Sequence, residues 1–467
     1  MSNQKVERNP PPGNEKDLYA KHQKVYPREV HGIFAMLRTL GVLVLLGIYY
    51  GVPWINWGDR QAVLFDLPGR KFHVLGLTFW PQDFFLLAVL LIIAALSLFF
   101  FTALAGRLWC GYACPQTVWT EVFLWFERKF EGDRPKQIKL DKAGWSGEKL
   151  LRKGGKHAAW IIFSLYTGLT FVGYFSPIRE LVPAFFGFQT SGWETFWILF
   201  YGFATWGNAG FLREQVCIYM CPYARFQSAM FDRDTLIIAY DEKRGEPRGS
   251  RKRGVDYKGQ GLGDCVDCTL CVQVCPTGID IRNGLQYQCI GCAACIDVCD
   301  EVMEKMGYPK GLVRYTTQHA MDGRPTKILR PRMFVYTGVL LVLLIGLAIG
   351  ISQRTLVGID VIRDRNTLYR EVNGLIENVY ILKLVNKDSI THRFEVSIDG
   401  LPGAELLVDA TGDIEVPSGG VLEVPARVRV DGSALPGASA EVQFTLESVD
   451  VPGLSYTRTG RFVGPFN

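Results

Sequence analysis

The chain has 467 residues, of which 48% are apolar and 21% are charged, and its formal net charge is +5. This length accommodates two or three domains, and the apolar fraction is high for a water-soluble protein with an ordinary charge content. The excess of Lys and Arg is gathered in a few loops, where it predicts membrane orientation, so nucleic-acid binding is excluded as the function.

The first part of the chain, residues 1–32, is polar and of mixed charge. It contains Pro10-Pro11-Pro12-Gly13 and shows no secretory signal. This composition predicts a disordered tail.

Five apolar stretches predict membrane-spanning helices, each of which needs about 20 mainly apolar residues. The fourth stretch is the weakest because it carries Asn208 and several glycines. The stretches are 39–57, 84–105, 158–176, 195–212 and 334–351. They predict a five-helix α transmembrane bundle.

The distribution of Lys and Arg predicts how these helices are oriented. The segments 107–156 and 213–332 are rich in Lys and Arg, whereas 58–82 and 177–194 contain few. Because basic loops stay on the cytoplasmic side, we expect the N-terminus and segment 213–332 in the cytoplasm and the C-terminus in the periplasm.

Two C-x3-C-P motifs follow the second and the fourth predicted span. They occupy residues 110–115 and 217–222, and each has an Arg shortly before it and a Gln after it. Their cysteines are Cys110, Cys114, Cys217 and Cys221. This similarity predicts an internal repeat of a two-helix unit that ends in a pair of thiols near the cytoplasmic face.

The spacing of these thiols indicates which chemistry they can support. Residues four apart on a helix have Cβ atoms about 5–6 Å apart, whereas a disulfide needs about 3.8 Å, so a bridge within one motif would be strained. Four soft thiolates from the two repeats would instead suit Cu(I). We therefore interpret the four cysteines as candidate redox thiols and as a candidate copper site. The alternative is that they are small buried residues at helix ends.

The other eight cysteines form two four-thiol runs, at residues 265–275 and 289–299. This is the bacterial two-cluster ferredoxin pattern, in which the fourth cysteine of each run ligates the other [4Fe–4S] cluster. Structural zinc and a disulfide framework are the alternatives, and the doubled spacing and the predicted cytoplasmic setting disfavour them. One departure is Asp300, which follows the second run where Pro276 follows the first. The pattern assigns Cys265, Cys268, Cys271 and Cys299 to the first cluster, and Cys289, Cys292, Cys295 and Cys275 to the second.

Beyond about residue 358 the chain consists of short alternating apolar runs, separated by turn signals such as Asp399-Gly400 and Asp431-Gly432. Runs of period two at this spacing predict an all-β immunoglobulin-like sandwich. This segment contains no cysteine. It can therefore hold neither a thiolate-bound cluster nor a disulfide.

The sequence as a whole predicts a multi-domain membrane protein whose α transmembrane bundle carries a cytoplasmic two-cluster ferredoxin-type (α+β) insert and a C-terminal all-β sandwich. The predicted domains are a tail (1–32), a four-helix membrane region with both C-x3-C-P motifs (33–230), the ferredoxin-type domain (231–330), the fifth membrane helix (331–355) and the periplasmic sandwich (356–467).

The combination of both ferredoxin-type runs, both C-x3-C-P motifs and the β-rich tail resembles one family over nearly the full length of the chain. This family is the cytochrome c oxidase accessory protein CcoG, also called FixG or RdxA. The resemblance implies a role in assembling cbb3-type cytochrome oxidase, by reducing Cu(II) to Cu(I) for the copper site of the oxidase. It also implies copper or redox roles for the four C-x3-C-P cysteines, and a copper chaperone or oxidase assembly factors as partners.

Two other functions are compatible with the sequence. One is a quinol-linked membrane conduit that feeds a periplasmic reductase, as in the more distant membrane ferredoxins of nitrate and nitrous oxide reduction. The other is a non-catalytic assembly scaffold or redox sensor. For the copper role we expect a cytoplasmic electron donor, and a homo-oligomer is left open.

Overall fold

The computed structural model describes residues 24–58, 60–364, 367–388, 390–408 and 414–465. Most of the predicted tail lies outside the described residues. Its last part, from residue 24, is an extended segment in which the amide of Arg28 donates to the carbonyl of Gln273 at 2.9 Å. This part of the chain is therefore bound to a residue that is distant in the sequence. Composition alone does not reveal such a contact.

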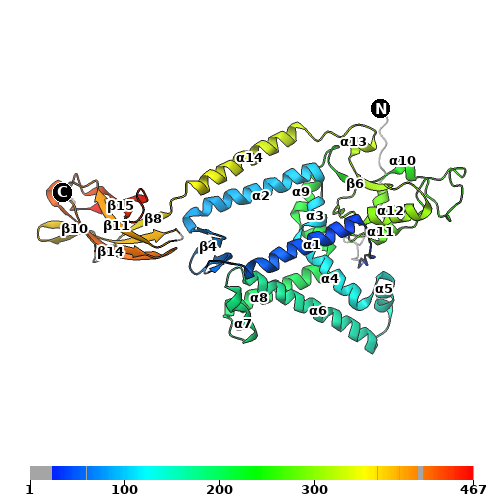
Figure 1. Ribbon diagram of the computed structural model, residues 1–467, viewed down its shortest axis with the longest axis horizontal. Helices are drawn as coiled ribbons and strands as arrows, with labels where there is room; N and C mark the ends of the chain where they lie inside the picture. Colours follow the sequence, from blue (N-terminus) through cyan, green and yellow to red (C-terminus); the bar gives the residue numbers. More distant parts are fainter. Residues whose placement is uncertain (1–23, 59, 365–366, 389, 409–413, 466–467) are drawn as a thin grey trace, which may run out of the picture. The chain divides into compact units, whose positions relative to one another are not determined.

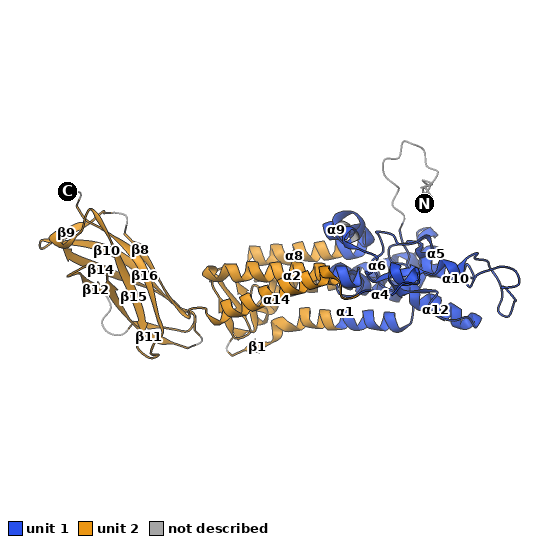
Figure 2. Cartoon of the chain, turned by 90° about the horizontal axis from the view of Figure 1, so that it is seen from above, with its two compact units in different colours: residues 1–43, 102–161, 207–327 blue, residues 44–101, 162–206, 328–467 orange. Residues whose placement is uncertain are grey.

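The chain forms two compact units, each built from several separate segments (Figure 2). The described part of the first unit comprises residues 24–43, 102–161 and 207–327. The second unit comprises residues 44–101, 162–206 and 328 onward.

Three helical segments are long and apolar enough to cross a membrane among the described residues. They are Ile33–Trp54, Pro81–Ala105 and Pro331–Ser352. They contain the helices α1 (Ile33–Gly51), α2 (Phe84–Ala105) and α14 (Pro331–Ser352), drawn in Figure 1. The first, second and fifth predicted spans overlap these segments.

The third and fourth predicted spans are helical but do not meet the same criteria. The third lies in α6 (Gly147–Val172), whose N-terminal half carries Lys153 and Lys156. The fourth begins in α8 (Gly192–Thr205), which has only 14 residues and continues as a π-helix, η3 (Trp206–Leu212). The five-helix bundle is therefore not confirmed, because charge shortens the apolar part of one helix and a change of helix type interrupts the other.

The first unit contains the beginning of α1, the ferredoxin-type runs and both C-x3-C-P motifs. A two-stranded antiparallel sheet pairs Ile237 with Thr316 and Tyr240 with Val313. Its further elements are α3 (Leu108–Tyr112), α4 (Pro115–Glu131), α5 (Arg134–Lys142), η4 (Val216–Met220), α9 (Pro222–Met230), β6 (Ile237–Tyr240), α10 (Glu242–Gly245), α11 (Leu270–Gln273), α12 (Ala294–Met306), β7 (Val313–Thr316) and α13 (Gln318–Met321).

Both C-x3-C-P motifs interrupt the helix in the same way. The backbone is extended at Cys114 (φ −63°, ψ 129°) and at Cys221 (φ −79°, ψ 109°). Pro115 and Pro222 then begin α4 and α9. Proline disfavours helical backbone at the residue before it and is suited to the first position of a helix. The second cysteine of each motif therefore stands at a helix N-cap.

The second unit ends in a sandwich of two antiparallel sheets (Figure 1). One sheet has the order β12-β14-β10-β8, with β9 paired to β10, and the other has the order β13-β11-β15-β16. Alternate residues of β14 and β15 are buried, as the period-two pattern predicts. The strands are β8 (Val357–Arg363), β9 (Arg370–Val372), β10 (Leu375–Asn386), β11 (His392–Asp399), β12 (Glu405–Val408), β13 (Ile414–Val416), β14 (Val421–Asp431), β15 (Ser439–Ser448) and β16 (Ser455–Val463).

The core of the sandwich lies between these sheets. Tyr380 of β10 and Phe444 of β15 are fully buried, and their ring centroids are 5.0 Å apart. Phe394 and Phe462 are buried in the same cluster. The sandwich thus has an apolar core of its own that needs no cofactor.

Candidate functional site

Each ferredoxin-type run bends at the residue after its second cysteine. Thr269 (φ +56°) and Ala293 (φ +59°) have left-handed backbone, and α11 and α12 begin directly after them. Left-handed backbone is uncommon outside glycine, so its use at the same place in both runs indicates a shared constraint. In each run, the helix that carries the third cysteine begins directly after this bend.

The fourth cysteine of the second run lies beside the first run. Burial, together with the neighbouring thiols of Cys271, Cys268 and Cys265, raises the pKa of the Cys299 thiol to about 12. Cys265 belongs to a buried cluster against which Cys271 and Cys299 pack, so three of the four cysteines assigned to the first cluster lie in one core.

The fourth cysteine of the first run lies beside the second run. Burial and the thiols of Cys292, Cys289 and Cys275 raise the pKa of the Cys295 thiol well above its ordinary value. A small cavity in this region is lined by these four thiols together with apolar residues such as Ile238. The structure thus also brings together the thiols assigned to the second cluster.

The surroundings of these eight thiols fit an iron–sulfur cofactor. A buried thiol with a raised pKa is poorly ionised by itself, whereas a bound metal deprotonates the thiols that coordinate it. All twelve cysteines are free thiols in this structure. The ligand assignment itself stays a prediction.

Asp300 has a structural role next to the first group of thiols. Its Oδ1 accepts a hydrogen bond from the amide of Gly311 at 2.8 Å. Its charge also contributes to the raised pKa of the Cys299 thiol. The position that departs from proline therefore holds a loop and places a carboxylate near the predicted first cluster.

The two C-x3-C-P motifs are linked through the glutamines that follow them. Gln116 donates from Nε2 to the carbonyls of Asn208 (2.9 Å) and Arg213 (3.2 Å), which precede the second motif. Gln227 accepts a hydrogen bond from the thiol of Cys110 in the first motif, with 3.4 Å between Sγ and Oε1. Each motif is therefore held by the glutamine of the other, which is the arrangement expected of an internal repeat.

A buried ion-pair network supports this arrangement. The guanidinium of Arg213 lies 2.7 Å from the carboxylate of Glu127, and Lys156 lies 2.7 Å from Glu131. Burial alone would raise the pKa of the Glu127 carboxyl, but Arg213, Lys156 and Lys24 hold it below its ordinary value. The network ties α4, which follows the first motif, to the residues that precede the second.

The first cysteine of each C-x3-C-P motif has a raised pKa. Burial raises the pKa of Cys110 to about 11 and that of Cys217 to about 12, and neighbouring thiols of the set add to both shifts. Within the part of the chain that the structure describes, no three His, Cys, Asp or Glu side chains are close enough to hold one metal ion. The copper site stays a prediction.

The first C-x3-C-P motif packs directly against the second ferredoxin-type run. A Cβ atom added to Gly111 would lie only 2.9 Å from the Cα and the amide nitrogen of Cys292. Only a residue without a side chain allows the two backbones to approach so closely. Gly111 follows Cys110 directly, so the thiol motif adjoins the loop that carries the predicted ligands of the second cluster.

Three polar side chains from different parts of the chain bind backbone carbonyls at the second ferredoxin-type run. Arg107 donates to the carbonyls of Tyr287 and Cys289, the latter at 3.2 Å. Arg38 donates to the carbonyl of Cys292 at 2.5 Å. The hydroxyl of Tyr315 donates to the carbonyl of Gly291 at 2.6 Å. Of these three residues, the sequence signals only Arg107, through its place before the first C-x3-C-P motif.

These features define an iron–sulfur protein of the electron-transfer class, and comparison with known sequences agrees. Residues 212–318 match a family described as a 4Fe-4S dicluster domain, and residues 87–132 match a 4Fe-4S binding domain. Residues 347–465 match the Ig-like fold at the C-terminus of FixG. The immunoglobulin-like nature of the C-terminal sandwich is thereby confirmed.

The chain belongs to the FixG/RdxA family. It is 39% identical over 439 residues to the nitrogen fixation protein FixG of Rhizobium meliloti, and this alignment covers 85% of this chain and 83% of the relative. It is 40% identical over 418 residues to protein RdxA of Cereibacter sphaeroides, covering 86% and 87% of the two chains. A crystal structure of a FixG-related protein from Vibrio parahaemolyticus, 31% identical, aligns with 23% of this chain and 95% of its own, with a TM-score of 0.21.

Proposed function

We propose that this chain is a membrane-bound iron–sulfur oxidoreductase that reduces Cu(II) to Cu(I) for the assembly of a cbb3-type cytochrome oxidase. The observation that carries the proposal is the contact of Gly111 with the backbone of Cys292. Because of this contact, an electron would have a short path from the predicted second cluster to the C-x3-C-P thiols. The matches to 4Fe-4S domain families support electron transfer as the general function.

In this proposal the eight ferredoxin-type cysteines hold two [4Fe–4S] clusters in the crossed arrangement. When bound, the clusters supply one-electron storage. Arg107, which precedes the thiol motif, and Arg38 of α1 both bind the backbone of the second run. Their charges lower the pKa values of the Cys289 and Cys292 thiols against the effect of burial. Positive charge at this place favours the more negative, reduced state of the site.

Copper enters this scheme as the substrate. Each Cu(II) ion takes up one electron, and soft thiolates such as those of Cys110 and Cys217 prefer the Cu(I) that is formed. The raised pKa values of these two thiols keep them protonated until a metal ion displaces the protons. Copper binding and proton release are therefore expected to be coupled.

The proposed partners follow from this role. The three apolar helices require a lipid bilayer, and the clusters require an electron donor. The C-terminal sandwich has no cysteine. We assign it to docking of a copper chaperone or of oxidase assembly factors, on the periplasmic side predicted from the charge distribution.

The test is to replace Cys110 and Cys217 with serine in the full-length protein. Anaerobically purified protein is reduced with dithionite, freed of excess reductant and mixed with Cu(II) while the cluster absorbance is followed. We expect reoxidation of the clusters to slow by at least about tenfold, a barrier increase of about 1.4 kcal/mol. The iron and sulfide content should not change.

A matched control replaces Thr445 with serine, which removes one methyl group in the C-terminal sandwich, a segment that contains no cysteine. Equal reoxidation rates for the double variant, the control and the unmodified protein would refute copper reduction at these thiols. A scaffold function would then be favoured.

A further inference from the structure

The first compact unit contains a cleft of about 910 Å³. It is lined by residues from 25–43, 116–128, 213–217, 274–277 and 290–294. The lining includes Cys292 of the second ferredoxin-type run and Cys217 of the second C-x3-C-P motif. A molecule in this cleft would therefore contact both parts of the predicted electron path.

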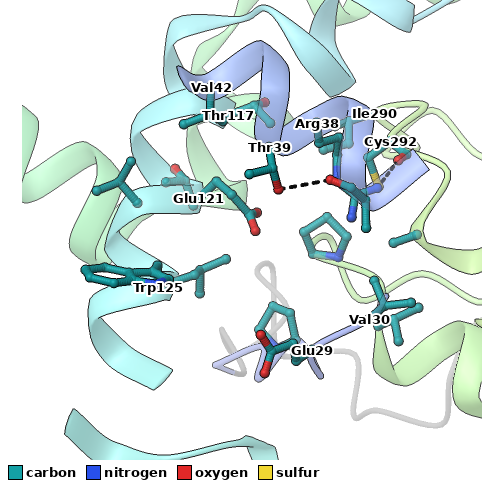
Figure 3. A pocket seen from close by; sticks show the side chains of 18 of the residues that line it. Glu29, Val30, Arg38, Thr39, Val42, Thr117, Glu121, Trp125, Ile290 and Cys292 are labelled. Carbon is teal, nitrogen blue, oxygen red and sulfur yellow. Dashed lines mark hydrogen bonds between the residues drawn. The ribbon is translucent and has the colours of Figure 1, made fainter. Parts of the chain in front are cut away.

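One wall of the cleft is apolar and comes from the first turns of α1. Met36, Leu40 and Leu43 follow one another at helical spacing, line the cleft and are 64%, 55% and 66% exposed. Trp125 of α4 lines the cleft as well and is also exposed (Figure 3). Because α1 belongs to a candidate membrane span, this wall suits a hydrocarbon chain that arrives from the bilayer.

Polar side chains are present in the same cleft. Figure 3 shows the carboxylates of Glu121 and Glu29 at the open space between α4 and the start of α1. Glu121 accepts a hydrogen bond from Arg128 at 3.4 Å, and the Nε of Arg128 is buried without a hydrogen-bond partner among the described residues. Arg38 also lines the cleft and donates a hydrogen bond to the carbonyl of Cys292. Hydrogen-bond donors and acceptors therefore converge next to the apolar wall.

The charges in the lining balance. Arg213 is already paired with Glu127, and the remaining charged residues of the lining are Arg28, Arg38, Arg128, Glu29, Glu121 and Glu214. A balanced set of charges favours a neutral headgroup with several hydrogen-bonding groups over a phosphate or another anion. The apolar wall in turn excludes a purely polar ligand such as a free metal ion or a nucleotide.

We propose that this cleft binds a membrane quinol, which donates the electrons. The proposal rests on the clusters of the proposed function and replaces the expected cytoplasmic donor. Oxidation of one quinol to the quinone releases two electrons, one for each predicted [4Fe–4S] cluster, and two protons. Glu121 and Glu29 accept the protons, and Arg38 orients the headgroup next to Cys292.

The binding test uses photolabelling, which does not depend on copper reduction. The full-length protein in lipid nanodiscs is illuminated with an azido derivative of a short-chain quinone, and the labelled peptides are identified by mass spectrometry. We expect the label on the segments 33–43 and 116–128. Replacing Leu40 with tryptophan fills the cleft and should reduce this labelling by at least about tenfold.

The matched control is Leu91→Trp, which adds the same bulk to an exposed leucine (61%) of α2 that does not line the cleft. This variant should keep the labelling of the unmodified protein. Equal labelling of all exposed apolar helices, or labelling that Leu40→Trp leaves unchanged, would overturn the quinol site.

A second variant tests the proton acceptor without filling the cleft. Glu121→Gln keeps the shape of the side chain, so it should retain photolabelling but slow the reduction of the clusters by added quinol by about tenfold or more. If cluster reduction by quinol is unaffected, Glu121 does not accept a proton. If photolabelling is confined to the cleft but dithionite-reduced protein fails to reduce Cu(II), copper reduction is refuted as the function and the quinol site is supported.

Discussion

Gly111 is the residue on which the proposed electron path depends most directly. An added methyl group would stand 2.9 Å from the backbone of Cys292, and backbone atoms at both sides leave little room to adjust. We expect Gly111→Ala to separate the thiol motif from the second run and to slow copper-dependent reoxidation of the clusters by about tenfold, because a displacement of about 1 Å between reacting groups can cost even more. Stopped-flow absorbance on dithionite-reduced protein measures this rate.

Gly47→Ala is the control for this change. Gly47 also lies in a helix, but an added Cβ atom would meet nothing within 4 Å. Both variants should retain the iron content of the unmodified protein. If Gly111→Ala reoxidises as fast as Gly47→Ala, the contact with Cys292 has no part in electron transfer.

At the scale of single residues, the sequence predicts ligands better than it predicts contacts. The eight ferredoxin-type cysteines could be assigned because their spacing follows from the geometry of the cluster. Gly111 and Arg38 could not be identified, because their partner Cys292 lies in a distant part of the chain and nothing local distinguishes them from other glycines and arginines. Arg107 was only indicated by the repeat.

The ion pair between Arg213 and Glu127 joins the two repeated elements and should be expensive to break. The side chains are 9% and 1% exposed, and the charged atoms are 2.7 Å apart. Glu127→Gln would leave the guanidinium buried beside a neutral partner, which typically costs about 3 kcal/mol or more. Hydrogen exchange of the α4 amides in the full-length protein measures this local loss of stability.

The control is Glu148→Gln, which removes an ion pair to Arg152 whose side chains are 70% and 41% exposed. Exposed pairs of this kind contribute less than about 1 kcal/mol, so α4 exchange should not change. If both variants behave alike, the buried pair does not hold α4 in place.

The same pair has a predictable dependence on pH. Because the pKa of Glu127 is lowered in the folded unit, the folded state binds its proton less readily than the unfolded state does. The stabilisation is therefore complete above the ordinary pKa of 4.5 and is lost as the pH falls below that value through the folded pKa. In Glu127→Gln this part of the acid sensitivity should be absent.

At the scale of helices and strands, the sequence predicts an element correctly where a single local pattern determines it. The prolines after Cys114 and Cys221 predict a break in the helix, and both cysteines do stand at helix N-caps. The alternating pattern likewise predicts the strands of the sandwich. The hydropathy pattern predicts one continuous span over 195–212, whereas the structure changes to a π-helix at Trp206. Average hydropathy does not detect such a change in hydrogen bonding.

At the scale of the whole molecule, the order of the parts could be predicted because each has its own composition. The thiol-rich segment and the alternating C-terminal segment differ plainly from the apolar helices. The division into two compact units could not be predicted, because α1, α2 and α6 each contribute to both units. A boundary inside a continuous helix leaves no Pro, Gly or charge signal in the sequence.

At this scale, the side of the membrane on which the loop 177–194 lies distinguishes five membrane crossings from three. If α6 and α8 both cross the membrane, this loop lies on the same side as the C-terminal sandwich. If only α1, α2 and α14 cross, it lies on the opposite side. We expect five crossings, so a cysteine introduced at the exposed Gln189 should react with a membrane-impermeant maleimide in spheroplasts.

Two further positions calibrate this experiment. Thr459→Cys in the sandwich should react, and Lys243→Cys, in the segment predicted to be cytoplasmic, should not. The twelve natural cysteines lie at residues 110–114, 217–221 and 265–299, in segments predicted to be on the protected side, so they should add little background. If Thr459→Cys is labelled and Gln189→Cys is protected, the chain crosses the membrane three times, and α6 and α8 belong to the cytoplasmic side together with the thiol motifs they adjoin.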